Sequence, residues 1–278
     1  MNILTEITKE VFESCVPVAK MPERNSSVYE RMTRMFSVSW ASVVSNILSP
    51  SHESHIDSDA SLKDECVRLV CLDTFIRTCR SLDVVLTATG FGIVSTESTA
   101  PASKLRVDAV VEEMMIERLL AIDNILSKLI RVKDWGATEQ ARLRISTLFY
   151  RPEHLRLFSS LPLTSVNWQL AINRSIVASV HLRREISAEY MDELLSKVRT
   201  GSLGNADIIV VDKCLRFIGD YISQGESAVP NKVMLEAIVE QLECYEESYP
   251  TYRLSRLYAT RHGKRYENKR DDPTFFFI

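Results

Sequence analysis

The stretch from Lys104 to Val132 repeats apolar side chains every three or four residues for about eight helical turns. The repeating residues are Val107, Val110, Val111, Met114, Met115, Leu119, Ile122, Ile125, Leu126 and Leu129. This spacing predicts one long amphipathic helix, and Pro101 and Ser103 suit its start. A chain built around such a helix is expected to be mostly helical.

Capping residues and apolar spacing predict nine further helices. They fall at about residues 6–14, 27–48, 62–87, 138–149, 152–160, 168–184, 187–199, 206–223 and 230–246. In the sixth of these, Trp168, Ile172, Ile176 and Val180 recur every four residues. Glycine is scarce, with 8 residues in 278, which argues against sandwiches and barrels with many tight turns. The predicted fold is therefore a mostly α helical bundle with long helices.

A segment rich in Gly, Ser, Thr and Pro separates the two longest predicted helices. It contains GFGIVST, which is short, apolar and β-branched, and its glycines permit backbone angles that other residues resist. We expect a small β-hairpin near 89–100 within a projecting arm at 88–102. The candidate contact residues of this arm are Gly90, Phe91, Gly92, Ile93 and Val94.

The C-terminal segment differs chemically from the rest of the chain. Residues 249–270 hold seven Lys and Arg against one Glu, a net charge of +6, and four of the nine tyrosines. Because the whole chain has a net charge of −3, the remainder carries −9. The chain then ends in DDPTFFFI, and exposed aromatic residues at a free terminus favour docking in a groove.

These features suggest three parts. The N-terminal helical half spans 1–134 and carries the arm, the C-terminal helical half spans 135–248, and an extended tail spans 249–278. The turn KDWGAT at 133–138 is the candidate boundary between the halves.

Three hypotheses remain open for the basic tail. It can dock on an acidic surface of a neighbouring subunit, bind nucleic acid through phosphate contacts and base stacking, or form a solvated basic helix face. The apolar end favours docking on protein, because nucleic acid offers no deep apolar pocket.

No catalytic or cofactor-binding constellation stands out. His52, His55, Asp57 and Asp59 are possible metal ligands, but they lie in a polar stretch and no matching ligand pair occurs elsewhere, so we expect no metal site. The chain has neither G-x-S-x-G nor a phosphate-binding glycine loop, and TGFG is too short to hold a phosphate. We expect no enzyme activity and no cofactor.

Compartment signals favour a protein made in a cytoplasm. The six cysteines form no C-x-x-C pair and are expected to be free thiols in a reducing compartment, with Cys66, Cys71 and Cys79 in the core. The N-terminus does not have the pattern of a signal peptide, and no segment has the roughly 18 to 20 apolar residues of a membrane span. We therefore expect no membrane partner.

Three pieces of the chain together carry a family resemblance. They are GFGIVSTESTAPASKLRVD between two long helices, VPVA ahead of the first long helix, and the ending YENKRDDPTFFFI. Over about residues 5 to 278 the chain resembles an uncharacterised family of tailed-phage and prophage virion proteins from gut bacteria. Members of that family look like neck proteins, namely head–tail connectors, adaptors or head-completion proteins.

The resemblance implies a non-enzymatic helical subunit in the virion neck, where copies form a ring, often of twelve, beneath the portal. The implied partners are its own copies, the portal protein, and further neck and tail proteins, with DNA passing through the lumen without sequence-specific binding. The arm and the tail would reach neighbouring proteins. The implied tail contacts are Arg253, Arg256, Arg261, Lys264, Arg265, Tyr266, Lys269, Arg270, Pro273, Phe275, Phe276, Phe277 and Ile278.

Overall fold

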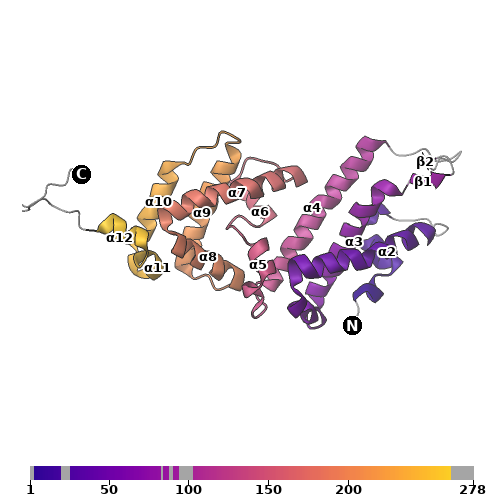
Figure 1. Ribbon diagram of the computed structural model, residues 1–278, viewed down its shortest axis with the longest axis horizontal. Coiled ribbons are helices and arrows are strands. Elements are labelled where there is room, and N and C mark those ends of the chain that lie inside the picture. Colours follow the sequence, from indigo (N-terminus) through magenta and orange to yellow (C-terminus); the bar gives the residue numbers. More distant parts are fainter. Residues whose placement is uncertain (1–2, 20–25, 83, 88–89, 94–102, 264–278) are drawn as a thin grey trace, which may run out of the picture.

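The computed structural model describes residues 3–19, 26–82, 84–87, 90–93 and 103–263 of the chain. The described part is elongated, with the N-terminal helices at one end and α10–α12 at the other (Figure 1). The expected mostly α fold is confirmed.

The first half is built on three long helices. Its helices are α1 (Lys9–Cys15), α2 (Ser26–Val43), α3 (Ala60–Thr78) and α4 (Lys104–Leu129). A π-helical turn, Val44–Leu48, extends α2. The side chain of Asp59 accepts a hydrogen bond from the backbone N–H of Leu62 at 3.0 Å and so caps the start of α3. Helix α4, the long helix expected from the apolar spacing, packs along α3.

The second half contains shorter helices. They are α5 (Glu139–Arg144), α6 (Pro152–Phe158), α7 (Ser165–Ile186), α8 (Ala188–Thr200), α9 (Asn205–Ser223), α10 (Lys232–Cys244), α11 (Pro250–Arg253) and α12 (Arg256–His262). Side-chain oxygens of Thr138, Thr164, Ser187 and Asn231 accept N–H hydrogen bonds at helix starts. These caps explain why the helix starts were close to those expected from sequence.

Two short strands follow α3. They are β1 (Val84–Thr87) and β2 (Gly90–Ile93), which pair antiparallel with Val84 opposite Ile93 and Thr87 opposite Gly90. The helix predicted to continue to Thr87 therefore ends at Thr78, because the β-branched run from Val84 pairs with β2 instead. Most of the predicted hairpin range 89–100, and of the arm at 88–102, lies outside the described residues.

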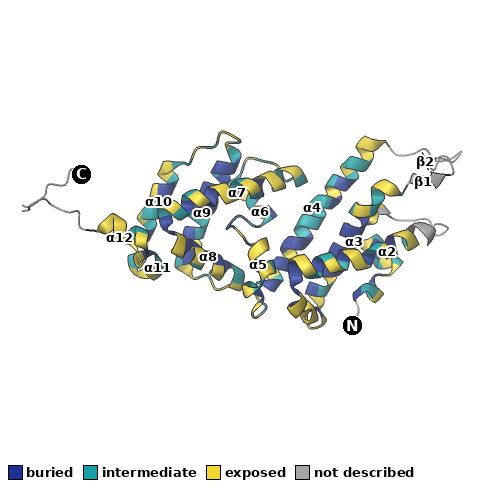
Figure 2. Ribbon diagram, in the orientation of Figure 1, coloured by how far each residue is buried: buried dark blue, intermediate teal, exposed yellow. Residues whose placement is uncertain are grey.

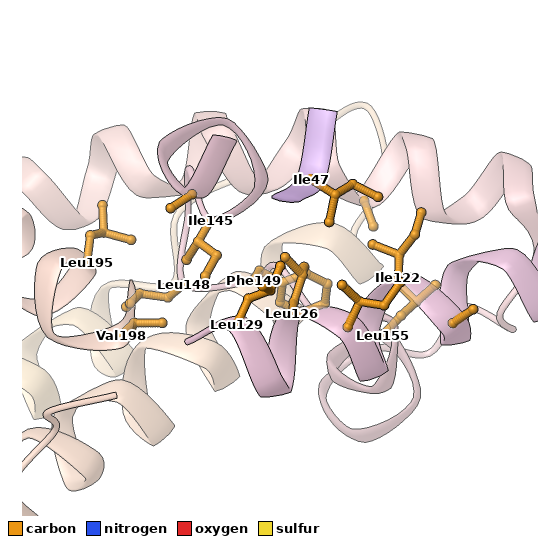
Figure 3. Close-up of a cluster of buried hydrophobic side chains, with 14 of the residues drawn as sticks. Ile47, Ile122, Leu126, Leu129, Ile145, Leu148, Phe149, Leu155, Leu195 and Val198 are labelled. Atoms are coloured by element: carbon orange, nitrogen blue, oxygen red, sulfur yellow. The ribbon is translucent and has the colours of Figure 1, made fainter. Parts of the chain in front are cut away.

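The predicted boundary at 134 falls inside the buried core. Trp135 is fully buried, and its indole Nε1 donates a hydrogen bond to the carbonyl of Ile47 at 3.1 Å. On the other side, a Cβ added at Gly136 would lie 2.6 Å from the carbonyl oxygen of Arg199 on α8. Residues of both halves point toward one another around Phe149 (Figure 3). Within the described residues the two halves thus share one apolar core.

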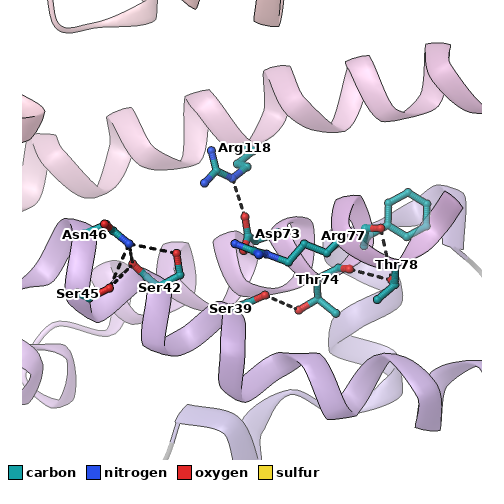
Figure 4. Close-up of polar contacts among 10 residues, drawn as sticks. Ser39, Ser42, Ser45, Asn46, Asp73, Thr74, Arg77, Thr78 and Arg118 are labelled. Carbon is teal, nitrogen blue, oxygen red and sulfur yellow. Dashed lines mark hydrogen bonds and ion pairs between the residues drawn. The ribbon is translucent and has the colours of Figure 1, made fainter. Parts of the chain in front are cut away.

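A buried carboxylate joins α3 to α4. The Asp73 carboxylate accepts hydrogen bonds from Nε of Arg118 at 2.9 Å and from Nε of Arg77 at 2.7 Å (Figure 4). Burial raises the pKa of Asp73, but the two guanidinium groups outweigh it, so the pKa lies below its ordinary value. Beside it, Thr74 donates to Ser39 Oγ at 3.0 Å and connects α3 to α2.

Helices α6 and α9 approach closely at Gly219. A Cβ added there would lie 2.0 Å from the carbonyl oxygen of Phe158 and 2.5 Å from its carbonyl carbon. Both atoms are backbone, so the clash cannot be relieved by a rotamer change.

We therefore expect Gly219→Ala to lower the free energy of unfolding by about 3 kcal/mol, because α6 must move away from α9. Urea denaturation measures this loss. Gly204→Ala is the matched control: its added Cβ would meet only Asp207 Oδ2, at 3.6 Å, and its cost should stay below about 1 kcal/mol. Equal losses in the two variants would contradict the close approach.

His154 on α6 lies among the rings of Phe149, Tyr150 and Phe158. Its Nδ1 is buried and has no hydrogen-bond partner among the described atoms. Burial, reinforced by the nearby Arg151 cation, lowers the pKa of His154 to about 4. The neutral imidazole is thus the form that the folded chain accommodates.

Stability is therefore expected to fall as the medium becomes acidic. Below an unfolded-state pKa near 6.5, the unfolded chain takes up a proton that the folded chain refuses until about pH 4. Between pH 7 and pH 5 this lowers the free energy of unfolding by about 2 kcal/mol. His154→Phe should flatten this part of the pH profile in urea denaturation. An unchanged profile in this variant would contradict the prediction.

Candidate interface surfaces

The predicted tail is folded over its first part. Tyr249 and Tyr252 are 1% and 0% exposed and belong to the core, and α11 packs against α8. The Tyr249 hydroxyl donates to the carbonyl of Ala206 at 3.1 Å. The extended tail predicted from residue 249 is therefore wrong as far as Gly263, because its tyrosines complete the core of the second half. Residues 264–278 lie outside the described residues.

Arg261 of α12 binds Glu185 within the same chain. Its Nη1 donates to the carbonyl oxygen of Glu185 at 2.7 Å and its Nη2 to the Glu185 carboxylate at 2.8 Å. Nη1 also lies 3.1 Å from the Tyr252 hydroxyl oxygen. Of the tail residues predicted to contact partners, only Arg253, Arg256 and Arg261 are described, and Arg253 and Arg256 are exposed.

The third tyrosine of this region is also engaged. Tyr258 stacks on His262 with ring centroids 4.2 Å apart, and its hydroxyl donates to Glu246 at 2.6 Å. Tyr249, Tyr252 and Tyr258 therefore stabilise the fold, and their rings are not available for stacking with nucleic-acid bases.

A groove of about 510 Å³ lies beside α12, between the C-terminal end of α7 and α10. Leu235 and Val239 give it apolar lining, and Glu236 and Glu243 give it acidic lining. The other lining residues are Glu185, Lys232, Arg261 and His262. The groove adjoins Gly263, from which residues 264–278 continue.

The predicted arm residues are described only in part. Gly90, Phe91, Gly92 and Ile93 form strand β2, while Val94 lies outside the described residues. Strands β1 and β2 lie beyond the ends of α3 and α4, at the end of the described structure opposite α12 (Figure 1). The structure therefore separates the two predicted contact regions along the longest axis.

Helix α7 carries exposed apolar residues that the sequence pattern had not singled out as a surface. Their exposed fractions run from 36% to 73%, and they are Val166, Leu170, Ile176, Val177 and Val180. The exposed side of α7 is visible in Figure 2. Its core side instead uses small residues such as Ala171, Ser175 and Ala178.

The four-residue repeat of Trp168, Ile172, Ile176 and Val180 marks this helix in the sequence, but its members differ in burial. Trp168 and Ile172 are half-buried, whereas Ile176 and Val180 are exposed. A four-residue step turns about 40° beyond a full helical turn, so the row rotates away from the core. Relative burial, which depends on the neighbouring helices, was needed to find this surface.

A smaller cavity of about 250 Å³ lies where α4, α5, α6 and α7 meet. Arg118 and Arg144 both line it, together with Trp168 and Tyr150. Burial, and then the Arg118 cation, lower the pKa of Arg144. Arg144 donates through Nε to the carbonyl of Asn46 at 2.9 Å, so it also holds the two halves together.

The two histidines considered as metal ligands have other contacts. His52 is buried, with Nδ1 2.9 Å from Ser51 Oγ and Nε2 3.3 Å from the carbonyl of Lys133. Its ring stacks on His55. The polar stretch predicted as a loop is a 3-10 helix over Pro50–Asp57. Among the described residues, no group of three or more His, Cys, Asp and Glu side chains is placed to hold a metal ion.

The thiols of Cys15 and Cys71 shift each other's pKa. A hydrogen bond with Cys71 lowers the pKa of Cys15 to about 7, against the effect of burial. The same hydrogen bond, together with burial, raises the pKa of Cys71. Cys66 and Cys71 are buried as expected, while Cys79 is only partly buried.

Comparison with known proteins gives one match. Residues 40–145 match a family of unknown function (DUF6712), a segment running from α2 through α3, β1, β2 and α4 to the end of α5. No curated protein and no solved structure matches the chain. In the described part of the chain, none of the helices combines the length and apolar character of a membrane span.

The folded state of the first tail residues generates a stability prediction. Tyr252→Ala should lower the free energy of unfolding by about 4 kcal/mol, because it leaves a cavity and removes the hydroxyl contact with Glu243. Leu254→Ala, two residues away at an 86% exposed position, should cost no more than about 0.5 kcal/mol. Urea denaturation of both variants compares them. A negligible loss of stability in Tyr252→Ala would instead support an extended tail from residue 249.

Proposed function

We propose that this protein is a non-enzymatic structural subunit of a phage virion, a head–tail connector whose copies form a ring in the neck. It would be made in the cytoplasm of the host bacterium. The observation that carries the proposal, beside the family resemblance, is the position of the two candidate contact regions. β1 and β2 lie at one end of an elongated helical subunit, and α12 lies at the other.

In a ring, the two contact surfaces of each subunit must keep a fixed position relative to each other. The shared core around Trp135 and Phe149 supports this requirement, because it joins the two halves without a flexible linker in the described residues. The β2 end would contact one neighbour, the portal or the next neck layer. The segment after Gly263 would contact another, with the Phe-rich end as its apolar anchor.

The folded residues narrow the proposed contacts. Tyr249, Tyr252 and Arg261 make contacts within the chain, so the proposed contacts lie in β2, at the exposed Arg253 and Arg256, and in residues 264–278. The same observation disfavours the alternative of nucleic-acid binding through 249–270, because three of its four tyrosines are engaged in the fold. A net charge of −3 for the whole chain is compatible with a lumen through which DNA slides.

Light scattering on the full chain and on a chain ending at Asp272 tests this proposal. We expect a discrete large oligomer from the full chain and its loss on truncation, because the truncation removes Pro273 to Ile278. Negative-stain images of the oligomer should show rings. A full chain that forms no ring, either alone or with the portal protein of the same genome, would overturn the proposal.

A further inference from the structure

The exposed side of α7 has the spacing of a helix–helix contact. Val166, Leu170, Asn173, Val177 and Val180 follow one another at intervals of four, three, four and three residues. This is the alternation by which two helices interlock their side chains along a seam. The four apolar members are 73%, 36%, 47% and 43% exposed, and Ile176 beside them is 50% exposed.

This seam carries no charge between Val166 and Val180. Its intervening exposed residues are Gln169 and Asn173, and Arg174 turns away to donate to the carbonyl of Ile222 at 2.9 Å. A solvated helix face is normally rich in charge. An uncharged apolar seam of four helical turns is instead typical of a surface that another helix covers.

We propose that α7 pairs with α7 of a second copy of this chain, antiparallel and around a two-fold axis. A second copy of α7 would supply a partner helix with the same apolar seam. Among the described helices, α7 alone carries more than two of the exposed large apolar residues. With the axis level with Ser175, Leu170 faces Val180 of the second copy, and Asn173 faces Val177 of the second copy.

The charges at the two ends of α7 select the antiparallel direction. At the N-terminal end, the Glu112 carboxylate accepts a hydrogen bond from the backbone N–H of Ser165 at 2.6 Å. At the C-terminal end, Arg184 continues the seam four residues after Val180 and is exposed. Antiparallel pairing brings Arg184 of each copy to the Glu112 end of the other and opposes the helix dipoles. Parallel pairing would place arginine beside arginine and glutamate beside glutamate.

The pairing goes beyond the proposed ring and is independent of it. A two-fold contact is complete with two copies, whereas a ring needs two different surfaces on each subunit. Five aliphatic side chains from each copy make a small interface, so the dimer is expected to dissociate on dilution in the micromolar range.

Sedimentation velocity between about 1 and 200 µM tests the pairing, because a micromolar dimer dissociates within this range. It is measured on the full chain and on the chain ending at Asp272, in which the proposed ring does not contribute. We expect the dimer fraction to rise with concentration, and Val177→Glu to weaken dimerisation at least about tenfold by placing a carboxylate in the seam. Val233→Glu, at a 74% exposed valine on α10, is the matched control and should dimerise like the native chain. A chain ending at Asp272 should also dimerise.

Disulfide cross-linking tests the direction. In a Cys244→Ser background, Leu170→Cys and Val180→Cys variants should cross-link when mixed and not when oxidised separately. Cross-linking of Leu170→Cys with itself would indicate parallel helices and overturn the proposal. It would also be overturned by a chain ending at Asp272 that is monomeric at 200 µM, or by a dimer of that chain that Val177→Glu leaves intact.

Discussion

The structure depends on the burial of apolar side chains at the point where the two helical halves meet. Trp135, Phe149 and Leu155 are excluded from water. Phe149 and Leu155 lie in one cluster with side chains from α4, α8 and the turn after α2 (Figure 3). Because all these elements share one apolar core, the burial of apolar side chains on each element depends on the presence of the others. Hydrogen bonds from Trp135 and Arg144 to backbone carbonyls of residues 46 and 47 set the relative position of the halves.

This shared core has a consequence for the contact surfaces proposed above. The proposed contact surfaces are carried by β2 at one end, the groove beside α12 at the other, and the uncharged side of α7 between them. Because the core links the elements that carry them, these surfaces keep a defined spacing. This fixed spacing is what the proposed role as a connector subunit would require.

The sequence predicted the helices better than the surfaces. Apolar spacing and capping residues located α4, α8 and α9 closely, since both signals act within a few residues of chain. The same local signals failed after Thr78, where pairing with β2 determined the conformation of Val84–Thr87. They failed again at Tyr249 and Tyr252. The basic composition of residues 249–270 indicated a tail, but both tyrosine side chains are buried in the core. The matched family segment adds no function to these observations.

What the sequence determined by itself was the helical class, the position of most helices and the chemical character of the chain end, because these follow from local periodicity and composition. Only the tertiary structure decided which apolar residues remain exposed. Ile176 and Val180 differ from Leu182 in exposure because α7 turns one side toward the core and the other toward solvent. It also decided that Trp135 belongs to both halves and that Arg261 binds Glu185, since these contacts join residues far apart in the chain.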